Sequence, residues 1–249
     1  MSVLVVTGTG TGVGKTVVTA AIAALALGRG SSVAVVKPGQ TGVTSDEPGD
    51  LDEVRRLVTP RDPVVGAALD LLELSRFADP LAPAAAARVA GRPAYALRDA
   101  VDVVRALADR HRLVLVEGAG GLLVRYDDEG TTIGDLARWL GAPCVVVTHA
   151  TLGTLNHTAL TLEAMAHRGL DLAGVVIGAW PAVPDLAARS NVRDLETLAA
   201  RPLSGSLPEH AGLLSPSDFA AVARLGLGPE LGGTFDAADF RRRAEPASS

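Results

Sequence analysis

Five short, uninterrupted runs of apolar residues constrain the fold of this chain more than any other feature. They are rich in β-branched residues and occupy positions 3–6, 33–36, 113–116, 144–147 and 175–177. Strands that are apolar at successive positions are typically buried on both faces of a parallel sheet. Stretches rich in Ala and Leu predict helices at 15–27, 51–58, 97–109, 155–167 and 185–200. The sequence therefore predicts a doubly wound α/β fold, with a mostly parallel sheet and helices on both faces.

The length and composition fit one domain of ordinary size. A chain of 249 residues can bury a substantial core without a structural metal or a disulfide. We expect residues 1–225 to form this single domain. From about Gly226 onward the sequence is rich in Gly, Pro, Ala and Ser and shows no clear period. We therefore expect residues 226–249 to form a poorly ordered tail.

Charge and cysteine content exclude several classes of function. The net charge of −5 argues against a nucleic-acid surface, and the one basic cluster, 241–243, lies in the predicted tail. No secretion signal is recognisable, and no apolar run reaches the roughly 18 residues needed to span a membrane. We expect a cytoplasmic protein that binds neither nucleic acid nor membrane. The single cysteine, Cys144, lies within an apolar run, so we interpret it as an inert core residue.

The chain contains only two lysines, Lys15 and Lys37, among 23 basic residues. Each lies in a segment that follows a predicted strand. Ammonium is a compact point charge whose pKa shifts on burial, whereas guanidinium is a planar fork that stays charged. Because arginine occupies every other basic position, we interpret both lysines as functional.

The first lysine closes a glycine-rich loop that predicts phosphate binding. The sequence Gly-Thr-Gly-Thr-Gly-Val-Gly-Lys-Thr at 8–16 links a strand to a helix. Glycines let backbone N–H groups face an anion, Lys15 reaches the β- and γ-phosphates, and Thr16 offers a hydroxyl to Mg²⁺. A strict Walker A motif has Gly five residues before Gly14, where this chain has Thr9, so the loop is a variant P-loop.

The second lysine is followed by a stiff exit and then by an acidic stretch. Pro38 removes a backbone donor and directs the chain off the strand, which aims Lys37 toward the phosphate loop. Lys37 is then placed to stabilise charge on a transferring phosphoryl group. The following segment offers carboxylates that can join Thr16 on Mg²⁺. We favour Asp50, with Asp46 and Asp52 as alternatives.

A third strand ends in an acid and then in glycines. Glu117 follows the run 113–116 and precedes Gly-Ala-Gly-Gly at 118–121. In P-loop enzymes an acidic residue at the end of a neighbouring strand commonly completes the Mg²⁺ shell. The sequence therefore predicts that Glu117 contributes to the metal site.

Together, these motifs and the segment Leu-Gly-Thr-Leu-Asn-His at 152–157 resemble dethiobiotin synthetase over roughly residues 1–225. The resemblance implies a fold of the P-loop NTPase type and a homodimer. It also implies that 7,8-diaminononanoate, CO₂ and ATP or another nucleoside triphosphate are converted to dethiobiotin, nucleoside diphosphate and phosphate. His157 belongs to the matched segment, whereas His149 and His167 are interpreted as structural or surface groups. No side-chain nucleophile is required.

The resemblance also implies the site residues. Lys15 and Lys37 would be catalytic, Thr16, Asp50 and Glu117 would hold Mg²⁺, and Thr11, Lys37, Thr41 and Asn156 would contact the diamine, with Asn156 acting across the dimer interface. The nucleotide would contact Gly12, Val13, Gly14, Lys15, Thr16, Val17, Asp50, Glu117, Gly118, Ala119, Gly120, Gly178, Ala179, Leu207, Pro208 and Glu209.

The sequence departs from the family at the expected base site. Many members have an Asn-Asp pair after the strand equivalent to 175–177, where this chain has Gly178-Ala179-Trp180. Backbone groups of 178–180 and 207–209 can still contact a base. We therefore expect a relaxed preference among nucleotides.

Two other functions fit parts of the sequence. A ParA-like partitioning ATPase shares the phosphate loop, but such proteins carry a lysine five residues before Lys15, where this chain has Gly10. A synthetase of the cobyrinate-amidating type would carry a glutaminase domain with a nucleophilic cysteine, which buried Cys144 cannot replace. Stimulation of phosphate release by a diamine, and not by DNA, distinguishes the leading hypothesis from the partitioning ATPase.

Overall fold

The computed structural model describes residues 2–58 and 68–245. Its strands are β1 (Ser2–Gly8), β2 (Val33–Lys37), β3 (Gln40–Thr41), β4 (Leu69–Glu73), β5 (Arg76–Phe77), β6 (Leu113–Glu117), β7 (Cys144–Thr148), β8 (Leu172–Trp180) and β9 (Gly205–Pro208). Its α-helices are α1 (Lys15–Leu27), α2 (Asp50–Val58), α4 (Pro83–Val89), α5 (Ala100–Ala108), α6 (Ile133–Leu140), α7 (Thr154–His167), α8 (Leu186–Ala199), α9 (Pro216–Gly226) and α10 (Ala237–Ala244). Short 3₁₀ helices are η1 (Leu97–Asp99), η2 (Ala211–Leu213) and η3 (Pro229–Leu231).

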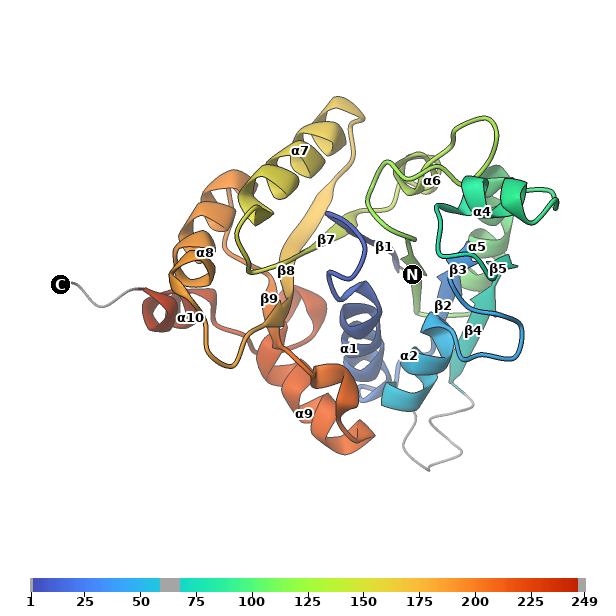
Figure 1. Ribbon diagram of the computed structural model, residues 1–249. Coiled ribbons are helices and arrows are strands. Elements are labelled where there is room, and N and C mark those ends of the chain that lie inside the picture. The colour runs from blue at the N-terminus through green and yellow to red at the C-terminus, as the bar shows by residue number, and fades with distance from the viewer. Residues whose placement is uncertain (1, 59–67, 246–249) are drawn as a thin grey trace.

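A seven-stranded sheet forms the centre of the molecule (Figure 1). Its order is β4-β2-β6-β1-β7-β8-β9, and every neighbouring pair is parallel. Strands β3 and β5 form a separate parallel pair. The predicted doubly wound α/β fold is confirmed.

Each central strand contributes to two cores, one on each face of the sheet. Successive residues of β7 alternate, because Val146 packs with α5, α6 and α8 whereas Val145 and Val147 pack with α1, α2 and α9. Side chains on a strand point to opposite faces in turn, so a strand covered by helices on both sides must be apolar throughout. This two-sided burial explains the uninterrupted apolar runs.

The predicted strands and helices correspond to observed ones, with one difference inside a helix. The segment predicted as a helix over 97–109 begins as η1 and continues as α5. The sequence did not reveal the outer strands β4 and β9. An edge strand is covered less completely than a central one, so β4 alternates in exposure, and β9 is short and contains Gly and Pro. These two strands lack the continuous apolar pattern that identifies the inner ones.

The C-terminal segment differs from the expectation of a poorly ordered tail. Residues 229–231 form η3 and residues 237–244 form α10, while Leu227, Leu231 and Ala244 are buried. Asp236 caps α10 by accepting a hydrogen bond from the backbone N–H of Asp239 at 2.9 Å. The prediction was wrong for residues 226–245 because a few apolar anchors suffice to dock a short helix. Residues 246–249 lie outside the described part of the chain.

Across residues 2–58 and 68–245, no helix is both long enough and apolar enough to cross a bilayer.

Cys144 offers a direct test of this packing. Its thiol is buried in β7, and burial, with a smaller contribution from Asp171, raises its pKa to about 12. Only the thiolate reacts with disulfide reagents, so we expect no labelling of the native protein at pH 8. Protein unfolded in guanidinium should react with one equivalent of the same reagent. Rapid labelling of the native protein would contradict this placement.

Candidate active site

The order of the strands brings the three predicted motifs together. Strands β2, β6 and β1 are neighbours, and the register pairs Val36 with Val116 and Glu117 with Val6. The carboxyl ends of these parallel strands therefore meet at one edge of the sheet. Ligands of open α/β sheets bind at this edge, in the crevice beyond the strand ends.

The phosphate loop has the backbone geometry that anion binding requires. Gly12 and Gly14 adopt positive φ angles of 76° and 93°, and α1 begins directly after Gly14. Among the described residues, no acceptor takes a hydrogen bond from the backbone N–H groups of residues 10–16. The Nζ of Lys15 donates to the carbonyl of Gly10 at 2.8 Å. The loop thus presents several free donors at a helix N-terminus, where the helix dipole also favours an anion.

Lys37 lies between two carboxylates at the centre of the site. Its Nζ is 2.8 Å from Oε1 of Glu117 and 2.5 Å from Oδ2 of Asp50. The side chain of Lys37 is 4% exposed and that of Glu117 is fully buried, whereas that of Asp50 is 36% exposed. Buried charges are tolerated when they are paired in this way. The pair therefore links the end of β2 to the end of β6, and Asp50 adds the start of α2.

The two lysines have opposite pKa shifts. Burial lowers the pKa of Lys15 to about 8, and repulsion from Lys37 adds to this effect. Burial alone would also lower the pKa of Lys37, but attraction to Glu117 and Asp50 raises it above its ordinary value. In turn, burial of the Asp50 carboxyl is outweighed by Lys37, so its pKa is lowered. Lys37 therefore stays charged at neutral pH, and Lys15, whose pKa of about 8 lies only a little above neutrality, would be held more firmly in its charged form by a bound phosphate.

One oxygen of Glu117 is left without a partner. Oε1 accepts hydrogen bonds from Oγ1 of Thr16 and Nζ of Lys37, both at 2.8 Å. Oε2 is buried and has no hydrogen-bond partner among the described residues. Among those residues there is also no group of three or more His, Cys, Asp or Glu side chains that could hold a metal alone. A hydroxyl and two carboxylates, one of which has an unpaired buried oxygen, fit Mg²⁺, which keeps water and phosphate ligands in such sites.

A cavity of about 490 Å³ adjoins this charged centre. Its far wall is apolar and includes Pro80, Leu81 and Val124. The predicted site residues that line it are Thr11, Gly12, Gly14, Lys15, Thr16, Lys37, Thr41, Asp50, Glu117, Ala119 and Gly120. One cavity thus combines a phosphate loop, two ammonium groups and an apolar surface.

The other predicted site residues lie outside this cavity. Asn156 is exposed on the first turn of α7. The remaining ones are Val13, Val17, Gly118, Gly178, Ala179, Leu207, Pro208 and Glu209. Gly178 nevertheless touches the phosphate loop, because a Cβ atom built on Gly14 would lie 2.8 Å from its carbonyl oxygen. The roles of these residues remain predictions.

The geometry distinguishes Asp50 from the two alternative acids. The carboxylate of Asp52 accepts a hydrogen bond from the backbone N–H of Gly49 at 2.8 Å, and its side chain is 53% exposed. Asp46 is exposed and accepts a hydrogen bond from the Ser45 hydroxyl at 3.2 Å. Only Asp50, of these three acids, contacts Lys37 and lines the cavity. Asp50 is therefore the acid that the structure brings to the site.

Two residues that position the site were not found from the sequence. The side-chain oxygen of Gln40 accepts the backbone N–H of Asp50 at 2.9 Å, which fixes the start of α2. The hydroxyl of Tyr126 accepts the backbone N–H of Ala119 at 2.5 Å, and the ring adjoins Gly39. Tyr126 thus joins the Glu117 loop to the Lys37 loop. Its one visible signal is that this chain has only two tyrosines.

Comparison with known proteins agrees with the geometry of the site. A sequence family described as an AAA domain matches residues 2–217. A relative from Parafrankia sp. (strain EAN1pec), described as ATP-dependent dethiobiotin synthetase BioD, is 63% identical over 98% of this chain and 99% of its own. One from Streptomyces avermitilis with the same description is 54% identical over 96% and 98% of the two chains. The chain belongs to the ATP-dependent dethiobiotin synthetase family.

Membership in the dethiobiotin synthetase family makes the chain a ligase that forms carbon–nitrogen bonds. Solved structures with a similar fold include a ParA family ATPase from Chlorobium tepidum TLS, with a TM-score of 0.54 and 15% identity over 98% of both chains. The septum site-determining protein MinD from Pyrococcus horikoshii OT3 has a TM-score of 0.55 and 17% identity over 93% and 94%. These likenesses show a P-loop NTPase fold alone. The ParA-like alternative is therefore limited to a shared fold.

We expect Tyr126→Phe to damage the site through the loop that it supports. The variant leaves the buried N–H of Ala119 without an acceptor, which lowers the free energy of unfolding by about 1–3 kcal/mol. Urea unfolding of the purified variant measures this change. Tyr95→Phe is the matched control, because Tyr95 is only partly buried, and surface-type changes stay within about 0.5 kcal/mol. Equal effects of the two substitutions would refute the supporting role.

Proposed function

We propose that this dethiobiotin synthetase joins 7,8-diaminononanoate and CO₂ at the cavity beside Lys37, using a Mg²⁺-bound nucleoside triphosphate. The observation that carries the proposal is the contact of Lys37 with Glu117 and Asp50 beside a phosphate loop and an apolar wall. Phosphate groups fit the loop, and the aliphatic chain of the diamine fits the wall. This chemistry forms no covalent bond to the protein, so it needs no nucleophilic side chain.

The reaction proceeds by three balanced steps. One substrate amine adds to CO₂ and loses a proton, which gives a carbamate. A carbamate oxygen then attacks the γ-phosphate and releases the nucleoside diphosphate. The second amine attacks the carbonyl of this mixed anhydride, loses a proton and displaces phosphate, which closes a cyclic urea. Such phosphoryl transfer depends mainly on positioning and on neutralising charge.

The residues of this chain supply both requirements. The N–H groups of residues 10–16 and the ammonium of Lys15 hold the β- and γ-phosphates. Lys37 faces the carbamate and the transferring phosphoryl group, where its positive charge offsets the negative charge that develops. Thr11 and Thr41 line the same cavity and orient the diamine through their hydroxyls. Lys37 is fixed by two carboxylates before the substrates arrive, which reduces the reorganisation during the reaction.

Thr16, Asp50 and Glu117 hold Mg²⁺ in this proposal. The bound ion would neutralise phosphate charge and orient the nucleotide. The unpartnered Oε2 of Glu117 supports this assignment, because a buried carboxylate oxygen is costly unless something binds it.

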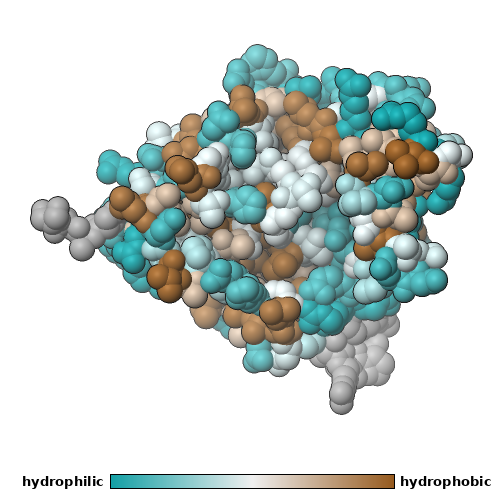
Figure 2. All heavy atoms as spheres, viewed as in Figure 1, coloured by the Kyte–Doolittle hydropathy of each residue, from teal (hydrophilic) through white to brown (hydrophobic). Residues whose placement is uncertain are grey.

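A homodimer completes the substrate site in this proposal, with Asn156 reaching the diamine of the partner subunit. A groove of about 420 Å³ between α7 and the loop 121–124 supports a protein contact here, and it is lined by Leu123, His157 and Leu160. Leu160 is 57% exposed and Leu123 is 47% exposed. Figure 2 shows hydrophobic residues gathered between α7 and α6. Apolar surface of this kind marks protein interaction sites.

The decisive test is phosphate release with Mg²⁺, bicarbonate and ATP, with and without 7,8-diaminononanoate. We expect release to require the diamine, and a product heavier than the diamine by one carbonyl and lighter by two hydrogens. Parallel assays with CTP, GTP and UTP measure the base preference, which we expect to be relaxed because no side-chain amide lies at 178–180. Diamine-independent release would reject the proposed substrate, and a strong preference for ATP would reject the relaxed base site.

A paired substitution tests the metal assignment. Asp50→Asn removes a carboxylate that contacts Lys37, so we expect kcat/KM to fall at least about tenfold, as when groups supporting a metal are removed. The Mg²⁺ concentration for half-maximal rate should also rise. Asp52→Asn is the matched control on the same helix and should change kcat/KM less than about twofold. A larger loss in the Asp52 variant would reverse the assignment.

A further inference from the structure

The pairing between β8 and β9 becomes irregular toward their carboxyl ends. Regular pairing runs from Val176 to Ile177, and the register then shifts before Trp180 pairs with Pro208. Beyond the shift, the backbone N–H of Glu209 donates to the carbonyl of Trp180 at 2.8 Å. The Glu209 side chain accepts the N–H of Ala182, also at 2.8 Å. The two segments are therefore held at their tips, and not by a continuous ladder.

The end of β8 also presses against the phosphate loop. A Cβ atom built on Gly178 would lie 2.0 Å from the carbonyl oxygen of Val13, so no larger residue fits without a shift. The backbone of Gly178 therefore lies in direct contact with the phosphate loop.

A cluster of aromatic side chains packs at the end of β8. The rings of Trp180 and Phe240 meet edge to face with centroids 4.8 Å apart, and Phe235 lies 5.2 Å from Phe240. We call these three residues the aromatic clamp. The chain has two tryptophans, two tyrosines and four phenylalanines, and three of these aromatic residues meet here. Aromatic pairs in this geometry contribute beyond the area that they bury.

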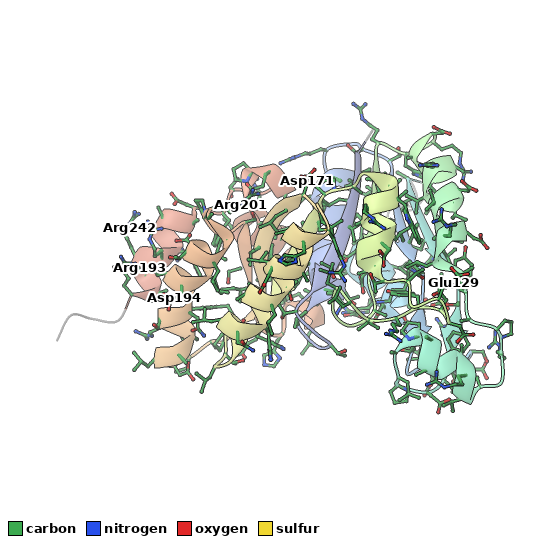
Figure 3. The ribbon with its side chains drawn as sticks, turned by 90° about the horizontal axis from the view of Figure 1, so that it is seen from above. Glu129, Asp171, Arg193, Asp194, Arg201 and Arg242 are labelled. Carbon is green, nitrogen blue, oxygen red and sulfur yellow. The ribbon has the colours of Figure 1, made fainter. Side chains whose placement is uncertain are left out.

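Helix α10, which carries Phe240, is itself fixed to the body of the protein. Nη1 of Arg241 is 2.6 Å from Oε2 of Glu196 on α8, and Oε1 of Glu196 accepts the N–H of Leu203 at 3.1 Å. Ala244 is buried in the core that α8 shares. Figures 1 and 3 show α10 lying beside α8 at the end of the molecule away from α4. These contacts fix the position of Phe240 relative to α8.

We propose that the aromatic clamp is a positioning device for the nucleoside half of the nucleotide site. The inference rests on the proposed function, in which backbone groups of 178–180 and 207–209 contact the base. Recognition by backbone groups works only if the backbone is held still, because no side chain can adjust to the ligand. The ring of Phe240 fixes the ring of Trp180, and the Trp180 carbonyl accepts the backbone N–H of Glu209. In this way the ends of β8 and β9 keep the spacing that a base requires.

Binding of ADP and of inorganic tripolyphosphate separates this role from general stability. Tripolyphosphate meets only the phosphate loop, whereas ADP also meets the strand tips. We expect Phe240→Ala to weaken ADP binding in calorimetry about tenfold or more, a loss of about 1.4 kcal/mol, because the displaced strand tips no longer fit the base. Tripolyphosphate binding should change less than about twofold. Phe240→Tyr, which keeps the ring, should restore ADP binding.

Val104→Ala is the matched control, because Val104 is buried in the same core cluster on α5 and lies outside the clamp. It should lower stability and leave both ligands' affinities unchanged. Unchanged ADP binding in Phe240→Ala, or equal losses for ADP and tripolyphosphate, would overturn the clamp. Failure of the unaltered protein to bind ADP would instead overturn the proposed nucleotide site.

Fluorescence gives a second readout that needs no unstable variant. The chain has two tryptophans, so Trp139→Phe leaves Trp180 as the single reporter. In this background, ADP should shift the emission of Trp180 and tripolyphosphate should not. Adding Phe240→Leu, which keeps apolar bulk without the ring, should remove most of the ADP response. A response to both ligands, or to neither, would contradict the inference.

Discussion

The buried ion pair between Lys37 and Glu117 is the interaction on which the rest of the site depends. Glu117 is fully buried and Lys37 is its charged partner, so removing Lys37 would leave an uncompensated buried charge that costs about 3–5 kcal/mol. The pair can form only because β2 and β6 are neighbours in a parallel sheet. Strand β1 connects through α1 to β2, which lies on the far side of β6. The chain order therefore leaves a place for Glu117 between the phosphate loop and Lys37.

The same pair gives the site a charge balance that couples its ligands. Lys15 and Lys37 face Asp50 and Glu117, so the four side chains are neutral together when all are ionised. A polyphosphate that enters must compete with both carboxylates for Lys37. In the proposed site a divalent cation would satisfy those carboxylates and the phosphate at once, so nucleotide and Mg²⁺ are expected to bind together more readily than either alone. This coupling follows from charge and burial, without any moving part.

Sequence reasoning succeeded where a feature is local. The inner strands carry uninterrupted apolar runs, and the glycine-rich segment between β1 and α1 forms the predicted loop, in which Gly12 and Gly14 adopt positive φ angles. It failed where tertiary contacts decide. Strand β9 has no apolar run of its own and exists because β8 pairs with it, and the support that Tyr126 gives to Ala119 depends on contacts between separate loops. Such partners cannot be read from spacing along the chain.

The C-terminal helix shows most clearly why composition misleads. Gly, Pro, Ala and Ser around 226–249 indicate disorder only if no residue among them finds a core to join. Phe240 packs against Trp180, and Arg241 forms an ion pair with Glu196, and both partners are distant in the sequence. A segment with so little apolar surface docks when its few large side chains all meet partners that the rest of the fold has already positioned. The order of this helix is therefore a consequence of the sheet, and the sheet's irregular β8–β9 edge in turn gains a support that its own pairing lacks.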